Sequence, residues 1–312
     1  MKVLVTGGGG FIGSHIVDAL IKAGHQPVIM DNFSSGSLDN IIYDVEIFDT
    51  DICNAEKVAS DFDKIKPDWV CHQAANCSVS ESMKNPAKDA QINIVGLLNV
   101  LENSAKHKVK KFVFASSGGT VYGENFNTIE EDSDTVPISA YGISKLTGEK
   151  YLNMYVMYHD LDCISLRYSN VYGPRQNPKG EAGVIAIFCR NILNDEKITI
   201  NGDGNYVRDY VYCTDVAQAN VKAFEKETMF REINISTGKR ETVNGIAMKL
   251  ISYISNEYFI NTMVAFDKAR KGDLRLNVLS PARAKLVLDW EPLISLDNGL
   301  IETIDYFYRY RQ

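Results

Sequence analysis

The residues best suited to chemistry in this sequence are a tyrosine and a lysine four positions apart, Tyr141 and Lys145. On a helix this spacing places both side chains on one face. A phenol titrates near pH ~10, so a tyrosine that works as a general base at neutral pH needs its pKa lowered by roughly three units. A neighbouring ammonium group would favour the phenolate. The pair therefore indicates proton transfer with a substrate hydroxyl.

Hydroxyl groups that could bridge a substrate oxygen to this base follow the apolar run Lys111–Ala115. They belong to Ser116, Ser117 and, after two glycines, Thr120. If the run is a strand of a doubly wound sheet, these groups lie at its carboxyl edge. Turn and cap roles for the serines stay open. We expect no metal, because the five histidines show no ligand spacing.

A glycine-rich segment, Thr6–His15, follows the first apolar run and opens the first amphipathic stretch. It fits two templates, G-x-G-x-x-G at Gly8, Gly10 and Gly13 and G-x-x-G-x-x-G at Gly7, Gly10 and Gly13. Either lets a pyrophosphate approach the backbone at a helix N-terminus. Asp31 closes the second expected strand and could accept hydrogen bonds from an adenosine ribose, which favours NAD over NADP. A turn or helix-capping role for Asp31 is the alternative.

The elements that must position these groups alternate in type. Short β-branched runs bounded by polar, Gly or Pro residues predict buried parallel strands at Lys2–Thr6, Gln26–Met30, Val45–Phe48, Trp69–His72 and Lys111–Ala115. Longer amphipathic stretches predict helices at Phe11–Ala23, Ala55–Ile65 and Pro86–His107. This order predicts an α/β fold with a doubly wound parallel (Rossmann) sheet.

After about Tyr168 the alternation loosens. A strand at Asp209–Tyr212, a helix at Val216–Lys226 and a mostly helical tail at Val278–Tyr310 predict a smaller, interleaved C-terminal α/β lobe. We expect residues 1–167, joined by about 209–235, to form an NAD-binding domain. Residues 168–208 and 236–312 would then form a substrate-binding domain.

Composition excludes several classes of partner. The 312 residues carry a formal net charge of −7, which argues against binding to nucleic acid or to an anionic membrane surface. No apolar run approaches the ~18 residues of a membrane span. The six cysteines show no C-x-x-C spacing, so we expect reduced thiols in a cytoplasmic protein.

Two helical stretches, Ile92–Leu101 and Tyr151–Tyr158, are apolar on more than one side. The sheet can cover one side of such a helix, and a second subunit related by a two-fold axis could cover the other. The pattern therefore predicts a homodimer, with burial inside one chain as the alternative.

Taken together, the motifs resemble the extended short-chain dehydrogenase/reductases over essentially the whole chain, and most closely the UDP-glucose 4-epimerases. The segments that carry the resemblance are Thr6–His15, Asp31-Asn32, His72–Ala75, Ser116-Ser117 with Val121–Gly123, Tyr141 with Lys145, Arg167–Gln176, Val207–Tyr210 and Arg270–Asp273.

The resemblance implies a set of NAD contacts along the first domain. They are Gly7, Gly10, Phe11, Ile12 and Gly13 at the pyrophosphate, Asp31, Asn32, Ser34, Ser35 and Gly36 at the adenosine ribose, Asp51 and Ile52 at the adenine, and Gln73, Ala74, Ala75, Asn93, Ser116, Tyr141, Lys145 and Tyr168 on the nicotinamide side. Cys77 stands where well-known bacterial epimerases carry a lysine.

The resemblance also implies catalytic and substrate residues. Ser117 matches the catalytic Ser/Thr, Tyr141 the acid/base and Lys145 its partner, with Ser116 and Thr120 as alternative hydroxyls. The UDP-sugar contacts are Val79, Ser117, Tyr141, Asn170, Gly183, Val184, Thr199, Asn201, Arg208, Arg270, Asp273 and Asn277. The two arginines would pair with the diphosphate, although an ion pair between Arg208 and Asp209 is an alternative for the first.

The implied reaction is the reversible interconversion of UDP-glucose and UDP-galactose through transient oxidation at C4 by tightly bound NAD. Dehydratases and decarboxylases of the same fold carry an acid where this chain has Gly118–Thr120. A non-catalytic NAD-binding regulator would not need the Tyr141/Lys145 pair. A small residue at Asn277, where a C2 gatekeeper aligns, leaves UDP-N-acetylglucosamine 4-epimerase activity as the alternative.

Overall fold

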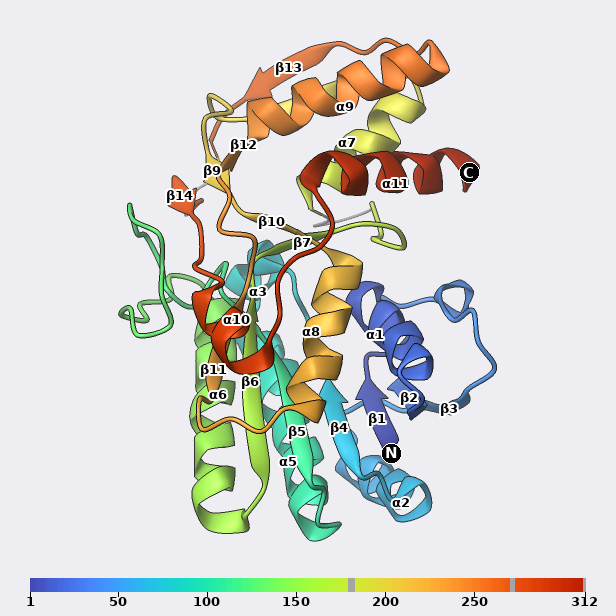
Figure 1. Ribbon diagram of the computed structural model, residues 1–312, viewed down its shortest axis with the longest axis vertical. Coiled ribbons are helices and arrows are strands. Elements are labelled where there is room, and N and C mark those ends of the chain that lie inside the picture. The colour runs from blue at the N-terminus through green and yellow to red at the C-terminus, as the bar shows by residue number, and fades with distance from the viewer. Residues whose placement is uncertain (179–182, 270–272, 311–312) are drawn as a thin grey trace.

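The larger of two lobes contains a seven-stranded sheet. The structure is a computed structural model that describes residues 1–178, 183–269 and 273–310. The strands are β1 (Lys2–Thr6), β2 (Gln26–Asp31), β3 (Glu46–Asp49), β4 (Trp69–His72), β5 (Lys111–Ser117), β6 (Asp162–Tyr168) and β11 (Glu232–Ile235). They pair in parallel in the order β11-β6-β5-β4-β1-β2-β3 (Figure 1). The order reverses between β1 and β4, so the expected doubly wound sheet is confirmed.

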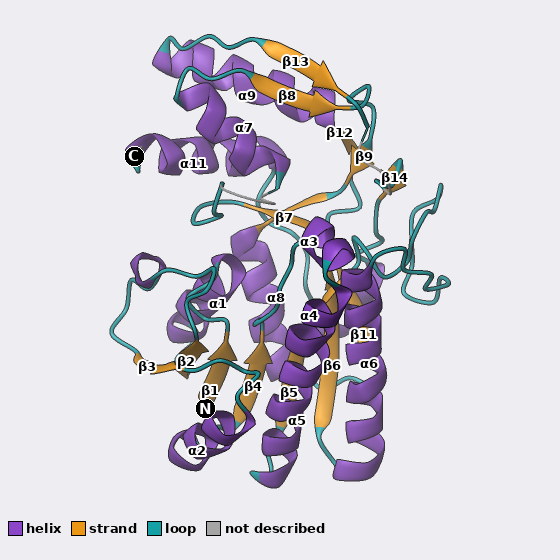
Figure 2. Cartoon of the chain, turned by 180° about the vertical axis from the view of Figure 1, so that it is seen from behind, coloured by secondary structure: helices purple, strands orange, loops and turns teal. Residues whose placement is uncertain are grey.

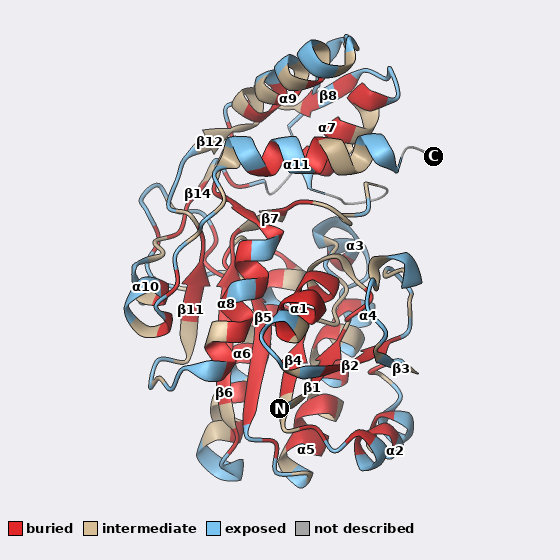
Figure 3. Ribbon diagram, turned by 45° about the vertical axis from the view of Figure 1, so that its right-hand side comes forward, coloured by how far each residue is buried: buried red, intermediate tan, exposed pale blue. Residues whose placement is uncertain are grey.

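Helices cover both faces of this sheet. One face carries α1 (Phe11–Lys22), α8 (Cys213–Glu225) and α10 (Ala282–Leu288). The other carries α2 (Ala55–Ile65), α3 (Val79–Lys84), α4 (Pro86–Ala90), the π-helix η2 (Gln91–Gly96), α5 (Leu97–Lys106) and α6 (Ala140–His159). A short 3₁₀ turn, η1 (Leu38–Asn40), lies in the loop between β2 and β3. Apart from the edge strand β3, the strands between the two layers are mostly buried (Figure 3).

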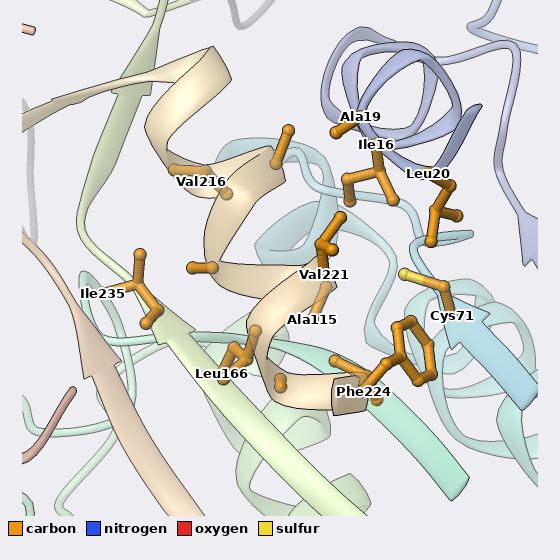
Figure 4. Packing of buried hydrophobic residues seen from close by; sticks show 14 of the residues in the cluster. Ile16, Ala19, Leu20, Cys71, Ala115, Leu166, Val216, Val221, Phe224 and Ile235 are labelled. Carbon is orange, nitrogen blue, oxygen red and sulfur yellow. The ribbon is translucent and has the colours of Figure 1, made fainter. Parts of the chain in front are cut away.

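Apolar side chains of α1 and α8 form the core of the first face. Ile16 and Leu20 from α1 lie near Val221 and Phe224 from α8, with Cys71 of β4 beneath them (Figure 4). Burying each large apolar side chain contributes about 1.5–3 kcal/mol. This packing fixes α1, and with it the glycine turn that precedes it, against the sheet.

The smaller lobe lies beyond the carboxyl edge of the sheet (Figure 2). It contains α7 (Val184–Leu193), β8 (Ile198–Asn201), α9 (Val243–Tyr258), β13 (Val264–Asp267) and α11 (Leu296–Arg309). Short strands lie between the lobes: β7 (Asn170–Tyr172), β9 (Val207–Arg208), β10 (Tyr210–Tyr212), β12 (Glu241–Thr242) and β14 (Leu276–Asn277). The pairs β8–β13 and β7–β10 are parallel.

Three expectations differ from the structure. The tail does not stay in the smaller lobe, because α10 packs on α8 and β11, and Leu288 and Trp290 join the core that contains Phe224. Asp209 lies between β9 and β10 and is fully buried, rather than starting a strand. The helix expected at residues 86–107 is divided by the π-helix. Within the described ranges, no helix is long and apolar enough to cross a membrane.

Candidate active site

The glycine turn between β1 and α1 leaves no room for side chains at two positions. Gly7 has a φ of 70°, and a Cβ there would lie 2.7 Å from the backbone nitrogen of Ala74. A Cβ on Gly13 would lie 2.1 Å from the carbonyl oxygen of Gly7. The N-cap residue of α1, Gly10, supplies no side-chain hydrogen bond to the first turn. The backbone N–H groups and the dipole of α1 therefore form a cradle suited to a pyrophosphate.

Asp31 ties the loop after β2 to this turn. Its carboxylate accepts hydrogen bonds from the backbone N–H groups of Gly9 (2.9 Å) and Phe33 (2.8 Å), and burial raises its pKa. The next residue, Asn32, donates to Asp51 (3.2 Å). The loop backbone at Gly36 comes so close to Gly9 that a Cβ would lie 2.7 Å from the Gly9 carbonyl carbon. Asp31 thus has the turn role that was its alternative, and its contact with a ribose stays a prediction.

Other residues of the expected adenosine contacts surround this loop. The backbone N–H of Ser34 donates to the Asn32 side chain (3.1 Å), and Ser35 follows in the same loop. Ile52 is buried beneath the π-helix, where a Cβ on Gly96 would lie 2.7 Å from its terminal methyl group. Phe11 and Ile12 form the first turn of α1.

The start of α6 brings Ser117, Tyr141 and Lys145 together. The Ser139 hydroxyl caps the helix by accepting a hydrogen bond from Gly142 N–H (3.1 Å). Lys145 is 3% exposed and donates to the carbonyl oxygen of Ala115 (2.8 Å), and its Nζ lies 5.7 Å from the centre of the Tyr141 ring. The Ser117 side chain forms a hydrogen bond with the Tyr141 phenol.

Burial changes the proton affinity of both members of the dyad. It lowers the pKa of Lys145 to about 8, and the acids Cys77, Asp89 and Glu149 oppose that change. Burial raises the pKa of Tyr141 above its ordinary value, and the hydrogen bond with Ser117 opposes that rise. A phenolate at neutral pH therefore needs positive charge beside it, which a protonated Lys145 supplies in part.

The structure distinguishes the three candidate hydroxyls. Ser116 is buried and its Oγ donates to Glu149 (2.5 Å). The Thr120 hydroxyl points to the backbone carbonyl of Ser117 (3.5 Å). Ser117 is the hydroxyl that the structure joins to Tyr141. As a direct contact to substrate, Ser116 is disfavoured because Glu149 already binds its hydroxyl.

A polar network positions the residues expected on the nicotinamide side. Asn93 lies in the π-helix and holds both the N–H and the carbonyl of Asn76 (2.9 Å each). Gln73 donates to the hydroxyl of Tyr168 (3.1 Å), and Ala74 N–H donates to Thr6 (3.3 Å). Ala75 lies between these anchors. Short π-helical segments are frequent at functional sites, and this one carries an expected site residue.

Arg208 pairs with Asp273, its neighbour among the expected substrate residues. The alternative ion pair of Arg208 with Asp209 is wrong. The Asp209 carboxylate is buried and accepts hydrogen bonds from Thr237 N–H (2.9 Å), the Thr237 hydroxyl (2.6 Å) and Gly238 N–H (2.8 Å). Arg270 lies outside the described residues.

Two amide side chains lie between the lobes. Asn277 is 1% exposed and donates to the carbonyl of Gly118 (3.1 Å), directly after Ser117, while its Oδ1 is buried without a hydrogen-bond partner. Asn170 donates to the carbonyl of Asp209 (3.0 Å).

The remaining expected substrate residues are spread over both lobes. Val79 begins α3 in the larger lobe, Gly183 and Val184 begin α7, and Thr199 and Asn201 lie on β8. The two β8 residues form a separate group on the smaller lobe.

Sequence reasoning missed two buried acids beside the dyad. Asp89 accepts hydrogen bonds from Asn93 and Ser144, and Glu149 forms an ion pair with Arg167. For Glu149 a signal was present, because it lies four residues after Lys145 and so shares its helix face. For Asp89 the only signal in the sequence was that it lies four residues before Asn93, an expected site residue, and so shares its helix face.

Comparison with known proteins agrees with this geometry. Residues 3–236 match the model of the NAD dependent epimerase/dehydratase family. The chain is 41% identical over 308 residues to a putative UDP-glucose 4-epimerase of Methanocaldococcus jannaschii, covering 97% of each protein. A UDP-glucose 4-epimerase of Thermotoga maritima, solved with UDP-glucose, has a TM-score of 0.95 at 43% identity and full coverage of both chains. A UDP-N-acetylglucosamine 4-epimerase of Methanobrevibacter ruminantium has a TM-score of 0.91 at 34% identity, covering 99% of this chain and 98% of that one.

Proposed function

We propose, since the chain belongs to the NAD-dependent epimerase/dehydratase family and uses NAD as its cofactor, that it interconverts UDP-glucose and UDP-galactose. The observation that carries the proposal is the contact among Ser117, Tyr141 and Lys145 at the carboxyl edge of the sheet. The likeness to the Thermotoga maritima protein supports the choice of sugar nucleotide.

The residues present fit the cofactor. Gly7 and Gly13 form a turn that any Cβ would fill, and α1 directs its N-terminus at that turn. The position of Asp31 beside this turn supports its role at the ribose, and the hydrogen bonds of Gln73 and Asn93 support their role on the nicotinamide side. When bound, NAD supplies the hydride chemistry that removes and restores hydrogen at C4 of the sugar.

The side chains of this protein transfer the proton and hold the sugar in position. The hydrogen at C4 is not acidic because no carbonyl adjoins it, so the carbon must be oxidised before its configuration can change. Tyr141 takes the O4 proton as C4 is oxidised and returns it when C4 is reduced from the other face. The Lys145 charge favours the phenolate, and Ser117 holds the same oxygen by a hydrogen bond. Arg208 and Arg270 bind the diphosphate while the keto sugar turns.

Asn277 bears on which substituent is accepted at C2. Its Nδ2 is engaged by Gly118, and its Oδ1 is a buried acceptor with no partner. A buried acceptor without a partner favours a ligand donor, such as a hydroxyl or an acetamido N–H at C2. The likeness to the Methanobrevibacter ruminantium enzyme makes UDP-N-acetylglucosamine 4-epimerase activity the second candidate.

The test is incubation of the protein with UDP-galactose and, separately, with UDP-N-acetylgalactosamine, followed by chromatographic separation of the sugar nucleotides. UDP-glucose from the first supports the proposal, and product from the second alone supports the second candidate. Tyr141→Phe serves as the control, because it should retain NAD and lose turnover. A wild-type protein that converts neither substrate would refute the proposed function.

The same proposal includes a homodimer built on the two apolar helical stretches. Met157 and Tyr158 on α6 are 74% and 75% exposed, and Val95 of the π-helix is 39% exposed. Large apolar groups exposed on adjacent elements favour coverage by a partner. Light scattering should give twice the monomer mass of 34.8 kDa.

A further inference from the structure

Asp89 is a fully buried acid that the mechanism does not use. It lies on α4 at 0% exposure and accepts two hydrogen bonds, from Asn93 Nδ2 (2.8 Å) and from the Ser144 hydroxyl (2.6 Å). Both donors are neutral. Among the described residues, no lysine, arginine or histidine forms an ion pair with it. A buried charge with neutral partners alone is costly unless another charge lies near.

The second buried acid next to the dyad is compensated differently. Glu149 forms two hydrogen bonds with the Arg167 guanidinium (2.9 and 2.7 Å), so its charge is balanced within its own network. Asp89 has no such partner. The cation left to balance it is Lys145, which follows the Asp89 hydrogen-bond partner Ser144 in the chain and is itself buried.

We propose that Asp89 is a positioning residue whose buried negative charge keeps Lys145 protonated and whose hydrogen bonds to Ser144 and Asn93 hold α6 against the π-helix. This inference rests on the proposed function. It assigns to a residue outside the dyad the charge balance on which the dyad depends.

The groups that face the dyad come from every element around it. His72 lies on β4, Cys77 in the loop after β4, Asp89 on α4, Glu149 on α6 and Tyr168 on β6. Burial lowers the pKa of His72 to about 3 and raises that of Tyr168, so both are neutral near pH 7. Cys77 and Asp89 both raise the pKa of Lys145 and of Tyr141. Because Arg167 balances Glu149, Asp89 is the buried carboxylate of this group that has no cationic hydrogen-bond partner.

The test uses Asp89→Asn, which removes the charge and can keep both hydrogen bonds because a serine hydroxyl both donates and accepts. Without the charge, the pKa of Tyr141 and that of Lys145 should both fall. In the pH profile of kcat with UDP-galactose, the acidic and the alkaline limb should therefore both move to lower pH, by on the order of 1 pH unit. A residue that only supports the fold would lower kcat and leave the limbs in place.

Ser144→Ala is the matched control. It removes one hydrogen bond from the carboxylate and retains the charge, so kcat should fall by a few-fold with both limbs at their wild-type pH. Limbs of Asp89→Asn that coincide with those of the wild type would overturn the proposal. If Asp89→Asn does not fold, Asp89→Thr repeats the test, since it also removes the charge and supplies a hydroxyl that can accept one of the two hydrogen bonds. Failure of both to fold would make Asp89 a purely structural residue and reject the proposal.

A second measurement separates this inference from the proposed function. Between pH 7 and 8 the free energy of unfolding of Asp89→Asn should rise more steeply with pH than that of the wild type. The reason is that Lys145 would lose its proton earlier in the folded state, while an unfolded lysine keeps it. This holds even if neither UDP-sugar is a substrate. Equal slopes would reject the role of Asp89 whatever the activity.

Discussion

One ion pair in each lobe shows two opposite ways of placing charged side chains. In the larger lobe, the ion pair of Arg167 and Glu149 is enclosed, with side-chain exposures of 5% and 1%. In the smaller lobe, the pair of Lys249 and Asp297 keeps exposures of 34% and 53%. Enclosed charges act on one another strongly, whereas solvent screens exposed pairs. The charges of Arg167 and Glu149 therefore act on each other and on nearby groups more strongly than those of Lys249 and Asp297 do.

Enclosed and exposed charges suit two different tasks, proton transfer and the binding of a diphosphate. Proton transfer by Tyr141 needs a fixed and nearly dry environment, because only there does the charge on Lys145 strongly favour a phenolate. Binding a diphosphate needs cations that can reach a ligand. The pair of Arg208 and Asp273, with side-chain exposures of 15% and 34%, lies between these extremes. Arg208 can exchange a carboxylate for a diphosphate without leaving a buried charge unpaired.

The largest effect should come from removing the enclosed cation. We expect Lys145→Met to lower kcat with UDP-galactose by about 10²–10⁴-fold, because Tyr141 then loses the charge that favours its phenolate. Steady-state kinetics measures the loss, and the NAD content of the purified protein shows whether the cofactor is retained.

A second buried lysine provides the matched control. Lys111 lies at the opposite end of β5, where its ammonium group bonds to the backbone carbonyl of Lys226 (2.5 Å). Lys111→Met removes a buried ammonium far from the dyad and should leave kcat near the wild-type value. Equal losses in the two variants would mean that burial of a lysine, and not its place beside Tyr141, explains the effect.

The next effect concerns stability and contrasts the two ion pairs directly. Glu149→Gln leaves the buried guanidinium of Arg167 without its counter-ion, so the free energy of unfolding should fall by about 3–5 kcal/mol. Asp297→Asn breaks the exposed pair with Lys249 and should cost about 0–1 kcal/mol. Urea denaturation measures both. Similar losses would contradict the distinction between an enclosed and a solvent-screened ion pair.

Local patterns predicted the parts of this molecule that depend on neighbours in the chain. The bounds of β1 and α2 agree with the expected Lys2–Thr6 and Ala55–Ile65, and the glycine turn lies where its spacing placed it. Strict alternation of strand and helix explains this, because each element there buries one face on the same sheet. The pairing of Tyr141 with Lys145 follows from helical spacing alone.

Features made by packing between distant segments could not be predicted in the same way. The return of α10 to the larger lobe depends on the fit of Trp290 into a core formed by α1 and α8. The helix α9 was not predicted, although Ile246, Leu250 and Ile254 recur every four residues and are buried in the structure. Asp89 looked like an ordinary acid in a first helical turn. Only the contact of α4 with α6 makes it a buried partner of Ser144.

The smallest of the three effects should come from the half-exposed cation between the lobes. Arg208→Ala should raise KM for UDP-galactose by about 10–100-fold and change kcat little, because a hydrogen-bonded charge pair contributes about 1.5–3 kcal/mol and Arg208 does not touch the dyad. Arg275→Ala is the matched control. Arg275 also pairs with an aspartate, Asp203, and also lies over the Tyr206 ring (4.7 Å, against 5.9 Å for Arg208). The KM of Arg275→Ala should stay near the wild-type value. A fall in kcat for Arg208→Ala would instead mean that Arg208 acts with the enclosed groups of the larger lobe.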